Sequence, residues 1–312
     1  MRIIYFGTPP FAADVLQYLI EKGVEVVAVV TKPDRPRGRS GKPAFSAVKE
    51  VITRSGSKIP LYQPDKASSP SFEKELSRYG ADLFVVVAYG EIMKQSLLDL
   101  PKEGAINLHT SLLPKYRGAA PIQFALLDGA KETGVSVIEM ALKMDAGDIL
   151  AQERIPIPKE MNLAELEERL LELGKETLLR VIENLPHHKK QKIKQNPNEA
   201  TFVQKIDPAM AEIDWAESAE TIHCQIRAFS PKPGAWTEVK IGAQVKRLKI
   251  FKAEIVDRGG APRDALAFTK NEWIIACGDQ ALSFLEVQLE GKKRLPIKEF
   301  ALAFSTPLTI AS

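Results

Sequence analysis

Two polar side chains at the end of an apolar run are the residues of this chain best placed to do chemistry. Asn107 and His109 stand two positions apart within the segment 106–123. On an extended strand, residues i and i+2 project from the same face, so an amide and an imidazole would lie side by side. A loop containing proline and glycine follows, and α/β proteins place binding and catalytic residues on loops at strand ends. The spacing therefore predicts a reactive site at this strand end.

A carboxylate further along the chain, Asp145, could complete a set that transfers an acyl or formyl group to an amine. It lies in the turn Met-Asp-Ala-Gly-Asp between two strand-like runs. Attack of an amine on such a carbon creates a tetrahedral oxyanion, which an amide or an imidazolium can stabilise. A carboxylate near His109 favours the imidazolium and can take the amine's proton directly or through water. From the residues alone a bland alternative stays open, in which Asp145 only shapes a turn and Asn107 and His109 form an ordinary polar pair.

Other kinds of catalytic centre have little support in the sequence. Cys224 and Cys277 stand in no metal or redox spacing, so we expect buried thiols in a reducing, cytoplasmic setting. No spacing typical of zinc and no serine or cysteine nucleophile motif is present. No apolar run reaches the roughly 20 residues of a membrane span, and the chain opens directly on a strand-like run, so we expect no signal peptide. Direct, metal-free transfer is the consistent interpretation.

The elements that would position the set follow the pattern of a parallel sheet covered by helices. Six runs are expected as strands: residues 2–6, 24–30, 82–88, 104–108, 134–139 and 149–157. An amphipathic helix over 11–21 would join the first two, and a longer one is expected over 163–184. This β-α-β opening predicts an α/β domain over residues 1–185 with a Rossmann-like, mostly parallel sheet.

The pattern changes after residue 185. Residues 186–205 are basic and polar without an apolar face, which predicts a linker. One helix over 219–229 and then a series of short strand-like runs follow, separated by glycine or polar turns. Such a series predicts a C-terminal OB-like antiparallel β-barrel over residues 206–312. A length of 312 residues fits two domains.

The net charge of +3 is small, but the basic side chains gather in runs. The four clusters are residues 32–42, 189–194, 240–252 and 292–294. Solvated surface explains any one run, whereas four of them make a polyanionic partner plausible.

Longer motifs surround the reactive set and extend over the chain. Asn-Leu-His-x-Ser-Leu-Leu-Pro-Lys-Tyr-Arg-Gly-Ala-Ala-Pro begins at Asn107, Glu-Thr-Gly-Val-Ser-Val-Ile begins at Glu132, and Met-Asp-Ala-Gly-Asp-Ile-Leu begins at Met144. They resemble the folate-dependent formyltransferases, whose Asn, His and Asp fall on Asn107, His109 and Asp145. The opening Ile-Ile-Tyr-Phe-Gly-Thr-Pro-x-Phe-Ala and the second-half motif Ile-Arg-Ala-Phe-Ser-Pro-x-Pro-Gly-Ala-Trp are similar to the branch that acts on tRNA.

The resemblance implies a donor, an acceptor and their binding residues. The donor would be 10-formyltetrahydrofolate, without a metal, and the acceptor the amino group of initiator methionyl-tRNA, for translation initiation. Backbone groups would largely hold the folate, at Ala88, Tyr89, Gly90, Ser111, Leu112, Leu113 and Pro114. The tRNA would meet Arg35, Arg37, Arg39, Lys42, Lys189, Lys190, Lys192, Lys194, Lys246, Arg247 and Lys249. Such an enzyme is expected to be a cytoplasmic monomer.

Three further interpretations stay open at this stage. Tyr116 and Arg117 follow the strand end in a loop, where they could control the approach of the amine. The same chemistry could serve a small amine, such as glycinamide ribonucleotide or an amino sugar. A non-enzymatic RNA-binding protein would use the barrel alone and would leave Asn107, His109 and Asp145 unexplained.

Overall fold

The computed structural model describes residues 1–36, 43–304 and 308–311. The chain forms two compact units. The first comprises Met1–Gly118, Thr133–Ile155 and Arg169–Phe202, and the second comprises Ala119–Glu132, Pro156–Glu168 and Val203–Ser312. Two short segments from within residues 1–185 therefore belong to the second unit.

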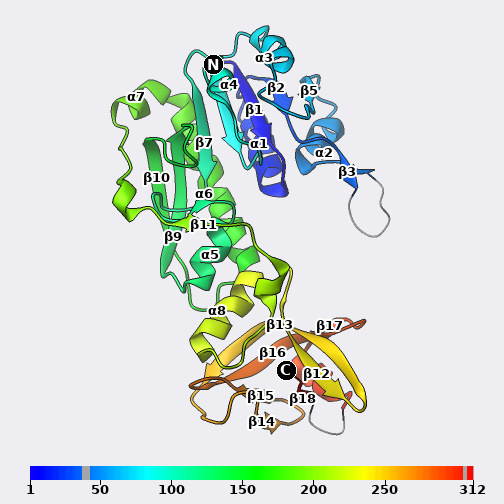
Figure 1. Cartoon of the computed structure of the whole chain (residues 1–312). Helices are drawn as coiled ribbons and strands as arrows, with labels where there is room; N and C mark the ends of the chain where they lie inside the picture. Colours follow the sequence, from blue (N-terminus) through cyan, green and yellow to red (C-terminus); the bar gives the residue numbers. More distant parts are fainter. Residues whose placement is uncertain (37–42, 305–307, 312) are drawn as a thin grey trace. The chain divides into compact units, whose positions relative to one another are not determined.

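The sheet of the first unit runs β10-β9-β7-β6-β1-β2-β5 within the described residues (Figure 1). Its strands are β1 (Ile3–Gly7), β2 (Val26–Val30), β5 (Leu61–Tyr62), β6 (Leu83–Val87), β7 (Ala105–His109), β9 (Glu132–Glu139) and β10 (Ile149–Pro156). The neighbours from β7 to β5 are parallel, and β9 is antiparallel to β7. Every residue of β1 and β6 is buried, as expected for strands covered on both faces. The predicted mostly parallel, Rossmann-like sheet is confirmed.

Helices pack on this sheet and decide which face of β7 is open. They are α1 (Pro10–Glu21), α2 (Ala47–Arg54), α3 (Pro70–Ser77), α4 (Gln95–Leu98), α6 (Leu163–Glu183) and α7 (Leu185–Lys190). At Gly174 of α6, an added Cβ would stand 3.1 Å from Leu108 Cδ2, so the helix lies against that side of β7. Because side chains alternate along a strand, Asn107 and His109 project from the opposite face.

The segment predicted as a linker makes backbone contacts with the first unit. Ile193 exchanges two hydrogen bonds with Ile149, at the start of β10, with N···O distances of 2.8 and 2.9 Å. A short turn, η1 (Pro197–Glu199), follows, and β11 (Phe202–Val203) pairs with β8 (Arg117–Gly118). Backbone N–H and C=O groups make these bonds whatever the side chains are, so a polar, basic sequence can be held without an apolar face.

The second unit is built around an antiparallel sheet ordered β14-β15-β16-β13-β12-β18, with β17 beside β16, within the described residues. The strands are β12 (Ala235–Ile241), β13 (Gln244–Val256), β14 (Ala265–Phe268), β15 (Trp273–Ala276), β16 (Ala281–Leu289), β17 (Arg294–Pro296) and β18 (Thr309–Ile310). The helical segments are α5 (Pro121–Leu127), η2 (Pro208–Ala211), α8 (Ala219–Phe229) and α9 (Ile297–Ala301). The predicted OB-like, antiparallel barrel class is confirmed.

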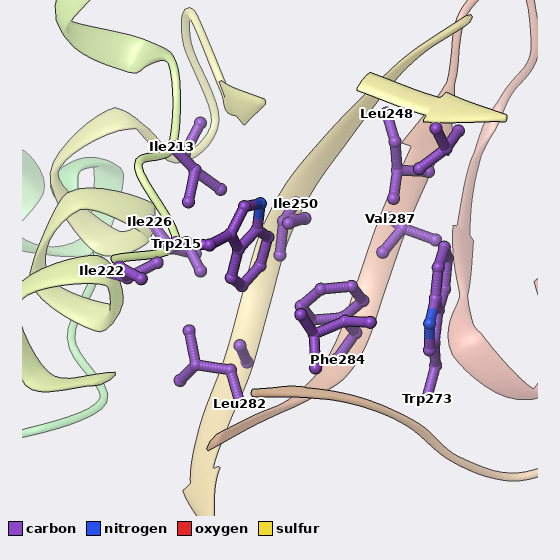
Figure 2. Packing of buried hydrophobic residues seen from close by; sticks show 14 of the residues in the cluster. Ile213, Trp215, Ile222, Ile226, Leu248, Ile250, Trp273, Leu282, Phe284 and Val287 are labelled. Carbon is purple, nitrogen blue, oxygen red and sulfur yellow. The ribbon is translucent and has the colours of Figure 1, made fainter. Parts of the chain in front are cut away.

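Aromatic and branched side chains fill this barrel-like sheet. Figure 2 shows Trp215 between Ile226 of α8 and Ile250 of β13. Trp273 is fully buried and meets Phe284 edge-on, with ring centroids 5.2 Å apart. The alternating pattern of the strands therefore places their bulky residues inside. These residues hold β12 and β13 on the core, and the remaining side chains of the two strands face outward.

Two further expectations concern thiols and membranes. Cys224 and Cys277 are free and buried, as predicted, and burial raises the pKa of Cys277 to about 12. Among the described helices, none has the length and apolar character needed to cross a membrane.

Candidate active site

Asn107 and His109 lie at the carboxyl end of β7, beside the ends of its neighbours. Asn107 is paired with Val86 on β6 and Ile138 on β9, and His109 is paired with Ser136. This regular register keeps both side chains on one face, as the spacing predicts. His109 is buried with 6% exposure, while Asn107 is half-buried. An oriented imidazole and a reachable amide therefore share this strand end.

The His109 ring lies between two oxygens from different segments. Its Nε2 is 2.9 Å from the carbonyl oxygen of Tyr116, and its Nδ1 is 3.7 Å from Oδ2 of Asp145. A carbonyl oxygen can only accept, so Nε2 carries the hydrogen of that bond. A proton arriving on Nδ1 would then face a carboxylate. The structure therefore brings His109 and Asp145 within ion-pair distance of each other.

Asp145 stands in the turn that joins β9 to β10, residues 140–148, which we call the Asp145 turn. Its φ of +50° lies in the left-handed region, which is uncommon for a residue with a side chain. Its Oδ2 accepts a hydrogen bond from the backbone N–H of Gly118 at 2.9 Å. At Gly147, an added Cβ would stand 1.7 Å from the carbonyl oxygen of Glu139. The turn is therefore tight, and its carboxylate is directed toward His109.

The loop 111–114, expected beside the folate, is held by side chains of β9 and β10. The Ser136 hydroxyl donates to the Ser111 carbonyl at 2.7 Å and accepts from the Leu113 N–H at 3.2 Å. The Gln152 amide donates to the Leu113 carbonyl at 2.9 Å. Two of the four side chains are buried and two are half-buried: Ser111 and Leu113, and Leu112 and Pro114, respectively. The loop is thus fixed in place, and its partly exposed surface is formed by Leu112 and Pro114.

Residues 88–90 follow β6, next to the end of β7. Ala88 and Gly90 are exposed and have φ values of +46° and +81°. The Tyr89 side chain instead points into the apolar core, where its ring meets Phe6 at 5.4 Å and burial raises its pKa well above the usual value. A ligand at this edge would therefore meet the backbone of residues 88–90 rather than the phenol.

The basic residues expected to meet tRNA are in varied surroundings. Arg35 is exposed on β3 (Arg35–Pro36), which pairs with β4 (Pro43–Ala44). The other expected contacts of that loop lie outside the described residues: Arg37, Arg39 and Lys42.

The four lysines of the predicted linker differ in whether they form an ion pair or are exposed to solvent. Lys189 Nζ lies 2.8 Å from a carboxylate oxygen of Glu103. Lys192 Nζ lies 2.6 Å from a carboxylate oxygen of Glu139. Lys190 and Lys194 are exposed. Two of the four positive charges are therefore already paired within the first unit.

On the second unit, the basic residues of β13 divide between the two faces of the strand. Arg247 and Lys249 are two apart and share one face, and Lys246 projects from the other. The Arg247 guanidinium lies 3.7 Å from the ring centroid of Trp236 on β12, in a cation–π arrangement. We call β12, β13 and the turn joining them the basic hairpin.

Sequence reasoning missed one residue that reaches the Asp145 turn. Gln195 lies in the segment predicted as a linker, yet it is buried and hydrogen-bonds the carbonyls of Asp145 and Gly147. Arg117, which the sequence left open as one of two residues that could control the amine's approach, is also buried and donates to Gln195. No local signal marks a glutamine among polar residues as buried, because only the packing of distant segments buries it. Within the described residues, no group of three or more His, Cys, Asp or Glu could hold a metal ion.

Comparison with known proteins shows which families and proteins the chain resembles. The formyl transferase family model matches residues 1–182, and the model for the formyl transferase C-terminal domain matches residues 205–305. A methionyl-tRNA formyltransferase from Protochlamydia amoebophila (strain UWE25) is 48% identical over 306 residues, which cover 98% of this chain and 96% of that protein.

Solved structures share the fold at lower identity. WlaRD, a sugar 3N-formyl transferase crystallised with dTDP and 5-N-formyl-THF, matches with a TM-score of 0.65 and 19% identity, covering 94% of this chain and 99% of that one. HypX from Aquifex aeolicus, in complex with tetrahydrofolic acid, matches with a TM-score of 0.62 and 18% identity over 96% of this chain. The match covers 46% of HypX, so the chain spans about half of that protein's length.

Proposed function

The chain belongs to the formyl transferase family, and from this premise we propose that it transfers a formyl group from 10-formyltetrahydrofolate to the amino group of initiator methionyl-tRNA. The nearly full-length similarity to a methionyl-tRNA formyltransferase supports this choice of acceptor. One observation carries the chemistry: Asp145 Oδ2 lies 3.7 Å from His109 Nδ1, beside Asn107 at a strand end. Asn107, His109 and Asp145 together form what we call the strand-end site.

The proposed reaction is a direct attack without a covalent enzyme intermediate. An α-amino group has a pKa of about 8, so a neutral fraction is present at physiological pH. The amine nitrogen bonds to the formyl carbon, and the electron pair of the C=O bond moves to oxygen. Asn107 and His109 stabilise that oxyanion. When the oxyanion collapses, the bond to the folate nitrogen breaks, and that nitrogen receives the proton that the amine gave up.

We propose a route for the proton that uses the geometry of the strand-end site. Nε2 of His109 stays bound to the Tyr116 carbonyl, so Nδ1 and the Asp145 carboxylate are the groups that can take up a proton. The pair holds the proton until the leaving nitrogen accepts it. The pair therefore acts first as base and then as acid, and no net proton is consumed within the site.

The donor and the acceptor would be bound by different parts of the chain. We assign the folate to the backbone of Ala88, Tyr89 and Gly90 and to the loop 111–114, because both follow strand ends adjacent to Asn107. Residues 1–185 would supply catalysis, and residues 206–312 would meet tRNA phosphates through basic side chains such as Arg247. A cytoplasmic monomer fits this role in translation initiation.

One assay tests the proposal and separates its rivals. The full chain is incubated with 10-formyltetrahydrofolate and methionyl-tRNA, with an amino sugar nucleotide, or with glycinamide ribonucleotide. We expect formyl-methionyl-tRNA and an equal amount of tetrahydrofolate. Transfer only to a small amine would contradict the proposed acceptor. Salt-sensitive tRNA binding without tetrahydrofolate release from any amine would instead support an RNA-binding protein.

A further inference from the structure

Gln195 links the segment after α7 to the Asp145 turn. Its side chain is buried with 6% exposure. Its Nε2 donates to two backbone carbonyls of the turn, at 2.8 Å to Asp145 and 2.7 Å to Gly147. One amide therefore fixes the carbonyl groups on both sides of Ala146.

A buried guanidinium sets the direction of this amide. The Arg117 Nε and Nη2 atoms donate to Gln195 Oε1 at 3.1 and 2.7 Å. An arginine has donors only, and a carbonyl oxygen accepts only, so the amide fits this site in a single orientation. The two bonds that the glutamine oxygen accepts and the two that its nitrogen donates agree with that orientation.

The turn that Gln195 contacts has an unfavourable backbone conformation, which must be stabilised by its surroundings. Asp145 has a φ of +50°, and the Gly147 backbone passes so close to Glu139 that no side chain fits there. Conformations of this kind cost free energy and persist where the surroundings impose them. Without the two donated hydrogen bonds, the Asp145 carbonyl would be left partly buried with one partner fewer.

The same short segment also reaches the other side of the strand-end site. The Tyr116 carbonyl accepts from His109, and the Gly118 N–H donates to the Asp145 carboxylate, with Arg117 between them. Residues 116–118 therefore contact His109, Gln195 and Asp145 in succession. A shift of the Arg117 side chain would be transmitted to both members of the proton-transfer pair.

We infer that Gln195 and Arg117 are positioning residues that hold the Asp145 carboxylate at its distance from His109. The inference rests on the proposed function, since it assigns a purpose to that distance. Gln195 contacts the turn through backbone carbonyls and acts on the reaction through Asp145.

The test replaces the donors of Gln195 while keeping its size. Gln195→Glu retains acceptors for Arg117 but directs a carboxylate oxygen at the two carbonyls. We expect kcat with methionyl-tRNA to fall about 10- to 100-fold, because small displacements of a catalytic group have effects of this size. KM for methionyl-tRNA should change by less than about twofold, since no group that binds the tRNA is altered. Gln191→Glu, an exposed change of the same kind in the same segment, should keep wild-type kcat.

Two further readouts separate positioning from general stability. In an Asp145→Ala background, Gln195→Glu should cause almost no further loss of kcat, because its effect passes through that carboxylate. Hydrogen exchange of the backbone amides in residues 140–148 should be faster in Gln195→Glu than in Gln191→Glu. If Gln195→Glu does not fold, Arg117→Lys, which removes the two-pronged donor, is judged by the same measurements.

The outcomes decide the inference separately from the proposed function. Wild-type kcat in the variant, unchanged exchange in residues 140–148, or full additivity with Asp145→Ala would each overturn it. A wild-type protein that does not formylate methionyl-tRNA would overturn the proposed function, and faster exchange in Gln195→Glu would still show that Gln195 holds the turn.

Discussion

His109 in the first unit is 6% exposed with both ring nitrogens near oxygens, whereas Arg247 in the second unit is exposed and stacks on Trp236. At the strand-end site, groups from two separate segments, β7 and the Asp145 turn, converge, and contacts with Tyr116 and Gly118 hold His109 and Asp145. On the basic hairpin, the exposed Arg247 contacts the Trp236 ring of the neighbouring strand through its guanidinium, and the Lys249 ammonium donates to the Pro233 carbonyl at 2.6 Å. The two regions therefore differ in how far the fold restricts their functional groups.

This difference separates two kinds of chemical task. Catalysis needs groups that are directed at one transition state. Burial and hydrogen bonds around Asp145 restrict its carboxylate to one direction, as such a role requires. Binding to a phosphate backbone depends on the number and placement of charges, which tolerates mobile lysines and arginines. Variants of the first region should change kcat, and variants of the second should change tRNA affinity and its dependence on salt.

The largest effect is expected at the strand-end site itself. Asn107→Ala should lower kcat by about 10²–10³-fold, the loss typical of one oxyanion donor. Steady-state formylation of methionyl-tRNA gives kcat, and filter binding gives the tRNA affinity, which should stay unchanged. Asn198→Ala, an exposed asparagine of the same unit, serves as the control. Near wild-type kcat in Asn107→Ala would rule out the proposed oxyanion role.

The glycines of the two regions provide a matched pair. Gly147→Ala would place a methyl 1.7 Å from the Glu139 carbonyl oxygen, so the Asp145 turn must move. We expect kcat to fall by about tenfold or more. Gly242→Ala, in the turn of the basic hairpin, meets no atom within 4 Å and is strained only by its φ of +59°. It should cost about 1 kcal/mol of stability and leave kcat intact, and equal kcat values in the two variants would contradict the comparison.

A smaller effect is expected on the exposed face of the basic hairpin. Arg247→Ala combined with Lys249→Ala should weaken tRNA binding several-fold at moderate salt. The slope of log affinity against log salt concentration should fall by about 1 for each phosphate that is no longer neutralised. Filter binding at several salt concentrations measures both quantities, with kcat unchanged. Lys58→Ala, an exposed lysine of the first unit, should leave the slope as it is, and an unchanged slope in the double variant would exclude a role for Arg247 and Lys249 at the phosphates.

The smallest effect concerns a buried histidine of the second unit. Burial, with nearby Arg227 adding to it, lowers the pKa of His223 below its usual value of 6.5. Below that pH the unfolded chain takes up a proton that the folded chain does not, so the free energy of unfolding should decrease as the pH falls. Urea unfolding at pH 7.5 and 5.5 measures this loss, which His223→Gln should reduce. His187→Gln, on an exposed residue, should not reduce it.

Much of the architecture could be predicted because it depends on local periodicity. The apolar runs of β1 and β6 and the alternation in β12 and β13 indicated a parallel sheet and an antiparallel one, and both are confirmed. The pairing of Asn107 with His109 on one face followed from a two-residue period. Buried Cys224 and Cys277 followed from their lack of partners in the sequence.

Other features depend on contacts between distant segments, and no local pattern predicts them. The backbone of Tyr89 stays a proposed folate contact, while its ring joins the core next to Phe6, which the sequence did not indicate. Two lysines of the basic run are paired with carboxylates of the first unit, which their own sequence cannot show. Gln195 looked like one more polar residue of a linker because its partners lie some 50 and 78 positions away.

The sequence by itself determined the elements of this protein, the residues proposed to react and the sign of its charged surfaces, because these depend on residue type and short-range spacing. Only the tertiary structure decided that Asp145 reaches His109, which of the basic side chains are already paired, and that Gln195 holds the Asp145 turn. Those outcomes depend on segments that meet only when the sheet is assembled and water is excluded between them. Around Gln195 the buried hydrogen bonds then have one arrangement, in which its amide nitrogen donates to the Asp145 turn and its oxygen accepts from Arg117.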